Sequence, residues 1–151
     1  MSWFPVLLAV HITLAVALLL PSVLLPFVLR RSSGPPGPVT RGLMAMQGGG
    51  TLVIAGGLAL TGMAMLWILG PELLGQPWLL VALVLYAANL AVAAFISRPN
   101  LRRLVGLRGA ADGADDQAWR HRARQQRYVA YGMAAVIGVI GFLMSTKPDL
   151  W

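Results

Sequence analysis

Four long segments made almost entirely of apolar residues constrain this chain more than any other feature. Each is at least as long as the ~20 residues that an α-helix needs to cross the hydrocarbon core of a bilayer. None contains Asp, Glu, Lys or Arg away from its ends. The sequence therefore predicts an all-α integral membrane protein with four transmembrane helices. Their approximate bounds are residues 3–29, 43–70, 77–97 and 127–146.

A β-barrel, the other architecture that can span a membrane, does not match this pattern. Helices and closed barrels both satisfy every backbone group in hydrocarbon, but barrel strands alternate apolar with polar residues. The continuous apolar run at 79–85 has no such alternation. We expect the first helix to be retained rather than cleaved as a signal peptide, because no basic region precedes it. The whole chain, 1–151, is predicted to form one membrane domain, a four-helix antiparallel bundle.

The basic residues predict how the bundle is oriented. The sequence has 12 Lys and Arg against 5 Asp and Glu, a formal net charge of +7. Its eleven arginines lie in or beside two connections, 30–42 and 98–126. Positively charged loops stay on the cytoplasmic side, so we expect both connections to be cytoplasmic and both termini to face outward. The tryptophans predicted near the outer interface are Trp3, Trp67, Trp78 and Trp151.

The connection at 98–126 is expected to be a loop on the membrane surface. Pro99 is predicted to end the third helix, because proline lacks the N–H that continues a helix. An amphipathic turn follows, which we expect to lie on the lipid headgroups. A basic helix is predicted to begin near Gln117, capped by an acidic residue at 115–116, and to continue into the fourth segment. The apolar residues of the amphipathic turn are Leu101, Leu104 and Val105.

Small residues predict where the helices pack. In lipid, helices associate through close contact at small side chains rather than through expulsion of water. The second helix is rich in glycine and the fourth has Ala and Gly at four-residue spacing, so we expect these two helices to form the central contact. A phosphate-binding loop is not indicated, because no Gly-Lys-Ser/Thr follows the glycines. The predicted packing positions are Gly56, Gly57, Gly62, Ala134 and Gly138.

His11 is the only histidine in a predicted span. Ionisable groups at membrane depth are costly and are often functional. At ~1.5 Å per residue, its depth is similar to that expected for Thr61, Tyr86 and Asn89, which would form one polar layer with it. The imidazole could ligate haem iron or copper, relay a proton, or hold the helices together by hydrogen bonds. If it is a ligand, we expect Thr61 and Tyr86 to support it. With no second histidine in a span, a bis-histidine haem within one chain is excluded.

The arginines of the long connection predict contact with anionic lipid or with a partner protein. Near an anionic bilayer surface each is worth on the order of 1 kcal/mol. Nucleic-acid binding is not expected, because there is neither a motif nor interleaved aromatic residues. His121 is not expected to hold a metal, because its arginine neighbours repel cations, and the lack of cysteine excludes thiolate sites. The arginines concerned are Arg102, Arg103, Arg120, Arg122 and Arg124.

Five short motifs follow one another along the chain. They are Leu8-Ala9-Val10-His11-Ile12, Thr61-Gly62, Gln76-Pro77-Trp78-Leu79, Arg127-Tyr128 and Phe142-Leu143-Met144-Ser145-Thr146-Lys147-Pro148. Together they resemble small bacterial four-helix membrane proteins loosely grouped with the HemJ-type protoporphyrinogen oxidases and the copper-resistance D membrane domain. The resemblance implies a four-helix bundle in a bacterial cytoplasmic membrane. In the HemJ-type members it also implies a haem associated with the first-helix histidine, which here is His11.

The other residues that the resemblance associates with catalysis are not retained. The Trp-x-x-Gly and Leu-Pro-Arg stretch expected after the histidine is replaced by 16–25, which has no charged group. The third helix has no lysine, and the region at 130–131 replaces the acidic residue expected early in the fourth. We therefore do not expect the oxidase activity.

Two functional hypotheses remain. A proton-coupled transporter needs a carboxylate within the membrane, and the predicted spans contain none. Hydrolases and transferases need a nucleophile beside a base, and the predicted spans do not offer this pair either. We therefore do not expect an enzyme. The first hypothesis is a non-catalytic accessory or scaffold subunit of a larger membrane complex, such as an electron-transfer or photosynthetic one, or a homo-oligomer. The alternative is a haem- or metal-associated redox membrane protein in which His11 is a ligand.

Overall fold

The described part of the chain is helical, as the all-α prediction requires. The computed structural model describes residues 3–31, 37–109 and 115–147, and within them no strand occurs. The α-helices are α1 (Phe4–Arg31), α2 (Pro38–Ala45), α3 (Thr51–Leu69), α4 (Pro77–Val92), α5 (Arg98–Gly109) and α6 (Asp115–Thr146). The remaining turns are two π-helical turns, η1 (Met46–Gly50) and η3 (Ala93–Ser97), and a 3₁₀ turn, η2 (Pro71–Gly75).

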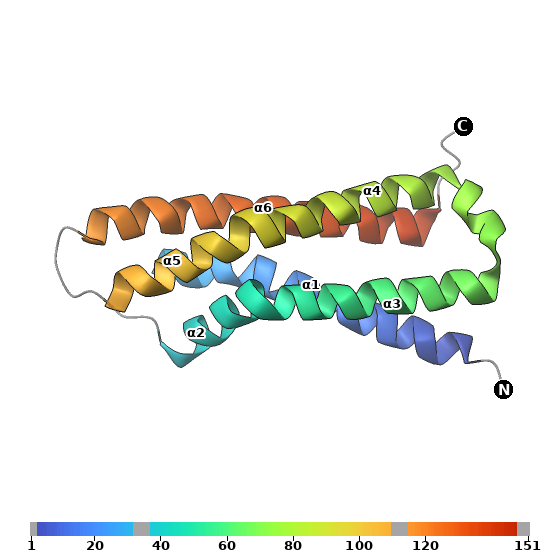
Figure 1. Cartoon of the computed structure of the whole chain (residues 1–151), viewed down its shortest axis with the longest axis horizontal. Coiled ribbons are helices and arrows are strands. Elements are labelled where there is room, and N and C mark those ends of the chain that lie inside the picture. Colours follow the sequence, from blue (N-terminus) through green and yellow to red (C-terminus); the bar gives the residue numbers. More distant parts are fainter. Residues whose placement is uncertain (1–2, 32–36, 110–114, 148–151) are drawn as a thin grey trace.

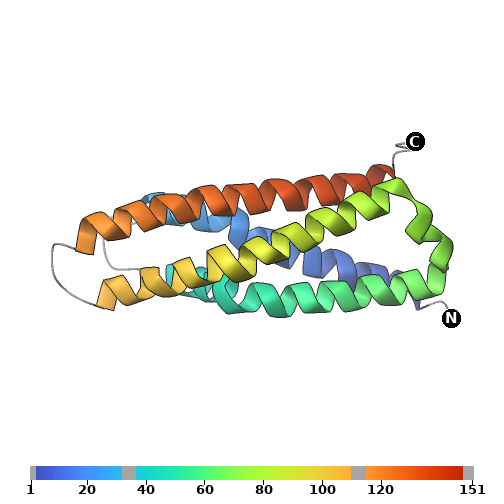
Figure 2. The ribbon, with the colours of Figure 1, turned by 45° about the horizontal axis from the view of Figure 1, so that its top comes forward.

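These elements build four spans, and each runs antiparallel to the span that precedes it in the chain (Figures 1 and 2). All four are long and apolar enough to cross a membrane, which confirms this part of the prediction. The start of α1, the turn η2 and the end of α6 lie at one end of the bundle, which we call the η2 end (Figure 1). The other end holds α2, α5 and the start of α6, and we call it the basic end. The first to fourth spans are Phe4–Arg31, Pro38–Leu69, Pro77–Leu104 and Gln117–Thr146.

The basic end contains more helix than the predicted loops 30–42 and 98–126 allow. The second span already begins at Pro38, whose fixed φ suits the first turn of a helix. The third span ends within α5, and this helix continues to Gly109. The basic helix expected near Gln117 begins at Asp115 and is continuous with the fourth span.

Pro99 does not end the third helix, contrary to the prediction. It lies within α5, directly after the π-helical turn η3. There the backbone N–H of Arg98 donates to the carbonyl of Ala93, five residues earlier. A proline removes one backbone donor, and local π adjustments re-satisfy backbone groups that a proline frees in a membrane helix. The turn therefore lets the helix pass through Pro99.

The second span contains an equivalent interruption at η1. Its backbone bond runs from the N–H of Thr51 to the carbonyl of Met46. The Thr51 hydroxyl lies 3.1 Å from that carbonyl oxygen and 3.0 Å from the Gln47 carbonyl oxygen. The turns η1 and η3 contact each other although they belong to different spans. Two spans thus depart from α-helical geometry at the same level of the bundle.

Three apolar clusters lie along the bundle interior. The basic-end cluster consists of Leu25, Leu29, Met44, Leu101, Leu104, Trp119 and Ala123. The central cluster consists of Leu18, Ala55 and Leu58. The η2-end cluster consists of Trp78, Leu79, Ala82 and Leu143.

The amphipathic turn after Pro99 packs inside the bundle, so its predicted place on the lipid headgroups was wrong. Leu101 and Leu104 are only 2% and 1% exposed, within the basic-end cluster. The physical reason is that α5 continues the third span and is covered by α6, with which it packs along its length. The side chain of Val105 lies outside the described residues.

The tryptophans divide between the surface and the interior. Trp3 and Trp67 are exposed, as residues at a membrane interface would be. Trp78 is buried in the η2-end cluster, where it packs among residues of the third and fourth spans. Trp151 lies outside the described residues.

The predicted central contact between the second and fourth spans was wrong. The membrane part of the second span, α3, packs mainly on α1, and α6 packs on α1 and α4. A Cβ added at Gly57 would lie 3.4 Å from Leu14 Cδ1, so this glycine lets α1 approach closely. Gly56 and Gly138 have nothing within 4 Å of such a Cβ, and Ala134 is half-buried on α6. Gly57 of α3 therefore accommodates a side chain of α1 rather than the small residues of α6.

Candidate functional site

His11 and Thr61 come together across the contact between α1 and α3. The imidazole Nδ1 lies 2.8 Å from the Thr61 hydroxyl oxygen, a hydrogen-bonding distance. The imidazole also interacts with the backbone of Leu58, one turn earlier on α3. Both side chains are half-buried. The bond thus joins residues fifty positions apart in the sequence.

The neighbours of Thr61 indicate which group donates in this hydrogen bond. Its hydroxyl oxygen lies 3.0 Å from the carbonyl oxygens of both Gly57 and Leu58 on its own helix. Threonine in a helix commonly donates its one hydroxyl proton to such a carbonyl. We infer that the oxygen then accepts a bond from Nδ1–H of His11, and in this neutral tautomer the ring has its lone pair on Nε2.

Gly62 makes room for the imidazole. A Cβ at this position would lie 3.4 Å from His11 Cε1. The sequence motif Thr61-Gly62 therefore has a local meaning: the threonine supplies the hydrogen-bonding oxygen and the glycine supplies the space beside the ring. Both residues thus contact the same histidine.

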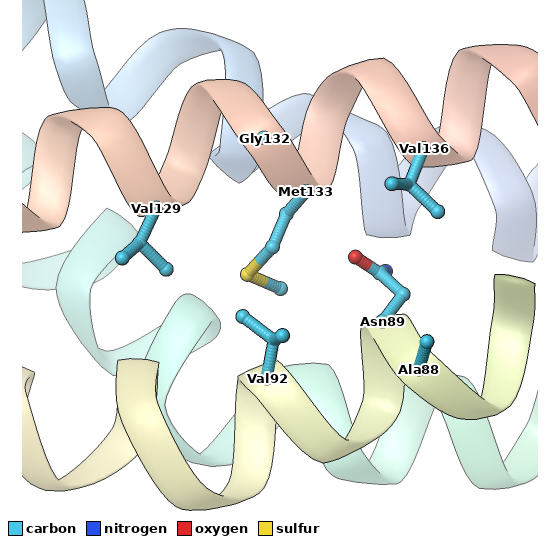
Figure 3. Close-up of a pocket in the computed structure, with 7 residues that line it drawn as sticks. All are labelled: Ala88, Asn89, Val92, Val129, Gly132, Met133 and Val136. Atoms are coloured by element: carbon cyan, nitrogen blue, oxygen red, sulfur yellow. The ribbon is translucent and has the colours of Figure 1, made fainter.

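Tyr86 and Asn89 do not join this pair. The Tyr86 hydroxyl donates to the carbonyl of Ala55 at 2.5 Å, six residues before Thr61 on the second span, and its ring packs on the central cluster. Asn89, one turn further along α4, is buried and lines a pocket of about 260 Å³ between α4 and α6. Asn89 and Met133 project into this apolar pocket (Figure 3). The predicted single layer is thus divided among three places.

A second polar cluster, which was not predicted from the sequence, lies closer to the basic end. Gln126 Nε2 donates to the Ser97 hydroxyl oxygen at 2.8 Å. Asn100 Nδ2 donates to Gln126 Oε1 at 2.9 Å and lies 3.4 Å from the carbonyl oxygen of Arg122. Gln47, fully buried on η1, has no hydrogen-bond partner for either its amide nitrogen or its amide oxygen.

The signal for this cluster was present in the sequence. Gln47 is the one amide within the predicted second helix, and Ser97 ends the predicted third. Asn100 and Gln126 fell inside the predicted loop 98–126, where polar residues need no explanation. Because the helices continue through this region, the same residues are in the bundle interior.

The arginines gather at the basic end, away from His11. Arg102, Arg103, Arg120 and Arg124 are exposed, and Arg122 is half-buried. Glu72, by contrast, lies in η2 at the opposite end. The basic end therefore presents a strongly positive surface, of the kind that attracts anionic headgroups.

Within the described residues, no three His, Asp or Glu side chains lie close enough to hold a metal ion together. Comparison with known protein families, with curated proteins and with solved structures finds no match for this chain. The likeness to HemJ-type proteins and to the copper-resistance D domain therefore stays a prediction from short motifs.

Proposed function

We propose that this chain is a multi-pass protein of a bacterial cytoplasmic membrane and serves as a non-catalytic accessory or scaffold subunit of a larger membrane complex. The proposal rests on the outer face of the second span, where exposed small residues lie among exposed large ones such as Val53 and Leu60. Glycines at 42, 49 and 56 follow a seven-residue spacing, and none has an atom within 4 Å of an added Cβ. The exposed small residues of this face are Gly42, Ala45, Gly49, Gly56 and Ala59.

In a bilayer, an open small-residue face is suited to the close approach of another helix. Small side chains let helix backbones come together and gain van der Waals contact, which replaces the missing hydrophobic driving force. The glycines that stabilise this chain internally, such as Gly57, point toward α1 instead. The face that contains Gly56 is therefore left for a partner, either another membrane subunit or a second copy of the chain.

The basic end gives the proposed orientation. Its arginines favour the cytoplasmic side, which places both termini outside. The spans are 28 to 32 residues long, so each measures about 42 to 48 Å at 1.5 Å per residue, against about 30 Å for the hydrocarbon core. The excess at the basic end would stand among anionic headgroups, within reach of Arg102 and Arg103.

The test is migration of the tagged protein from its native membrane on a native gel in mild detergent. We expect the wild type to migrate in a larger complex and Gly56→Leu to release it as a smaller species. Gly138→Leu is the matched control, because it adds the same side chain at an open position on another face. Wild-type migration as a monomer, or equal mobility of all three proteins, would contradict the proposal.

A second candidate function is supported by the Nε2 lone pair of His11. A metal-ligating histidine commonly donates its other ring N–H to a fixed oxygen, and Thr61 provides such an oxygen at 2.8 Å. His11 would then be a haem or metal ligand, alone or across a homodimer, in a redox membrane protein. A Soret band in the purified native protein that is lost in His11→Ala would favour this function over the first.

A further inference from the structure

The buried polar side chains near the basic end form a layer to which all four spans contribute. None is more than 7% exposed. The first span contributes a serine, the second a glutamine, the third a serine and an asparagine, and the fourth a glutamine. The members of this polar layer are Ser22, Gln47, Ser97, Asn100 and Gln126.

Apolar clusters close the polar layer on both sides. Along the second span, Met44 of the basic-end cluster precedes Gln47, and Ala55 of the central cluster follows it. The first span shows the same order in reverse, with Leu18 before Ser22 and Leu25 after it. The layer is therefore enclosed by apolar side chains within the bundle.

Hydrogen bonds within the layer leave the Gln47 amide unsatisfied. Gln126 bonds to Ser97 and to Asn100, at 2.8 and 2.9 Å. Gln47 is 0% exposed, and neither its Nε2 nor its Oε1 has a partner. Buried polar groups without partners are rare in folded proteins, because each carries its full desolvation cost.

The surroundings of Gln47 depart from regular helix on three sides. Its own turn, η1, contacts η3, α5 and α1. Both η1 and η3 are π-helical. On α1, the buried prolines Pro21 and Pro26 each remove the N–H that would bond the carbonyl four residues earlier. Backbone oxygens freed in this way belong to Ala17 and Ser22.

We propose that the Gln47 amide binds at least one internal water molecule, held in the polar layer between η1, η3 and α1. The amide offers a donor and an acceptor together, and water satisfies both, as internal waters commonly do for buried polar groups. A metal cation is a poor occupant, because none of the four apolar segments supplies a carboxylate. An anion would meet amides and hydroxyls with no cationic side chain in the layer.

Substitution of Gln47 by methionine distinguishes a hydrated amide from an unsatisfied one. Methionine has nearly the same length and no hydrogen-bonding group. If water bridges Gln47 to the rest of the layer, Gln47→Met strands that water's other partners and lowers the melting temperature in detergent. If the amide is truly unsatisfied, Gln47→Met removes the desolvation cost and raises the melting temperature, which would overturn the proposal.

Two other glutamines provide controls in the same chain. Gln126→Met removes an amide that makes two side-chain hydrogen bonds. We expect the melting temperature of this variant to fall whether or not water is present, because the partners lose those bonds. Gln125→Met changes an exposed side chain and leaves the melting temperature unchanged. We expect Gln47→Met to resemble Gln126→Met rather than Gln125→Met.

A measurement on the wild type keeps the proposal testable if Gln47→Met does not fold. Nuclear magnetic resonance of the ¹⁵N-labelled protein, with magnetisation transferred from water, reports which side-chain amides touch long-lived water. We expect a water contact at the Gln47 amide that persists when the surrounding micelle is deuterated. A Gln47 amide signal with no water contact would refute the proposal, independently of the function of the protein.

Discussion

Thr61→Val is expected to weaken the contact between α1 and α3 by a measurable amount. Valine nearly preserves the volume of threonine and removes the hydroxyl that lies 2.8 Å from His11 Nδ1. Hydrogen bonds between membrane helices average about 0.6 kcal/mol and reach about 1.7 kcal/mol. The His11 bond is short and half-buried beside Gly62, so we expect about 1 kcal/mol. That energy corresponds to roughly a fivefold change in the unfolding equilibrium constant.

A double-mutant cycle isolates this energy from the other effects of each substitution. The cycle combines Thr61→Val with His11→Leu, which makes the span more apolar and should leave membrane insertion intact. Reversible unfolding in mixed detergent and SDS micelles, followed by tryptophan fluorescence, gives the free energy of each variant. The two costs should fail to add, by about 1 kcal/mol.

Thr13→Val is the matched control for the cycle. The Thr13 hydroxyl is exposed and donates to the carbonyl of Ala9 on its own helix, at 2.8 Å. It makes the same local bond as Thr61 without a partner on another span. Its coupling to His11→Leu should be close to zero. Additive costs for Thr61→Val and His11→Leu would refute the inferred bond.

Three further predictions concern packing, the polar layer and orientation. Gly57→Leu should lower the free energy of unfolding by about 1–3 kcal/mol, because the new side chain would meet Leu14. Gly56→Leu should leave the free energy of unfolding in detergent unchanged. Equal effects of the two substitutions in SDS unfolding would contradict this packing. Gln126→Leu should lower the free energy of unfolding by about 1–3 kcal/mol for each partner left without a hydrogen bond, Ser97 and Asn100. Ser97→Ala should lower it by less. A Gln126→Leu protein more stable than the wild type would show that the network is not formed. Because the chain lacks cysteine, single introduced cysteines can map its orientation. Gly75→Cys at η2 should react with an impermeant maleimide on intact cells, and Arg103→Cys should react only after permeabilisation. The reverse pattern would exclude the proposed topology.

The number and type of the membrane spans could be predicted from the sequence, because length and continuous hydrophobicity suffice for that purpose. The ends of the helices could not. A proline such as Pro99 usually marks a helix boundary in a sequence. Only the π-helical turn at Ala93–Ser97 shows how the helix continues past it. Leu101 and Leu104 then belong to the interior, although the surrounding arginines suggested a surface loop.

The candidate site was also predicted only in part. The depth of His11 in its span indicated a polar partner on another helix, and the structure places Thr61 beside it. Depth alone could not place Tyr86, because residues at similar depth can face different neighbours. The glycines identified α3 as a packing helix but not its partner, since composition does not say which neighbour fills the space. Gln47 was missed because a single amide has no periodicity to reveal it.

The π-helical turn η1 makes the second span sensitive to the number of residues as well as to their kind. A π turn contains one more residue than the α-helix would use over the same stretch, since its bonds reach five residues instead of four. Deleting one exposed glycine, Gly49, would therefore restore α-helical bonding and leave α2 facing nearly the same way relative to α3. Thr40 and Met44, both buried now, would keep their places in the interior. A second deletion, or an insertion, would instead rotate α2 by about 100°, so the second span should tolerate the loss of one residue near 49 better than the loss of two or the gain of one.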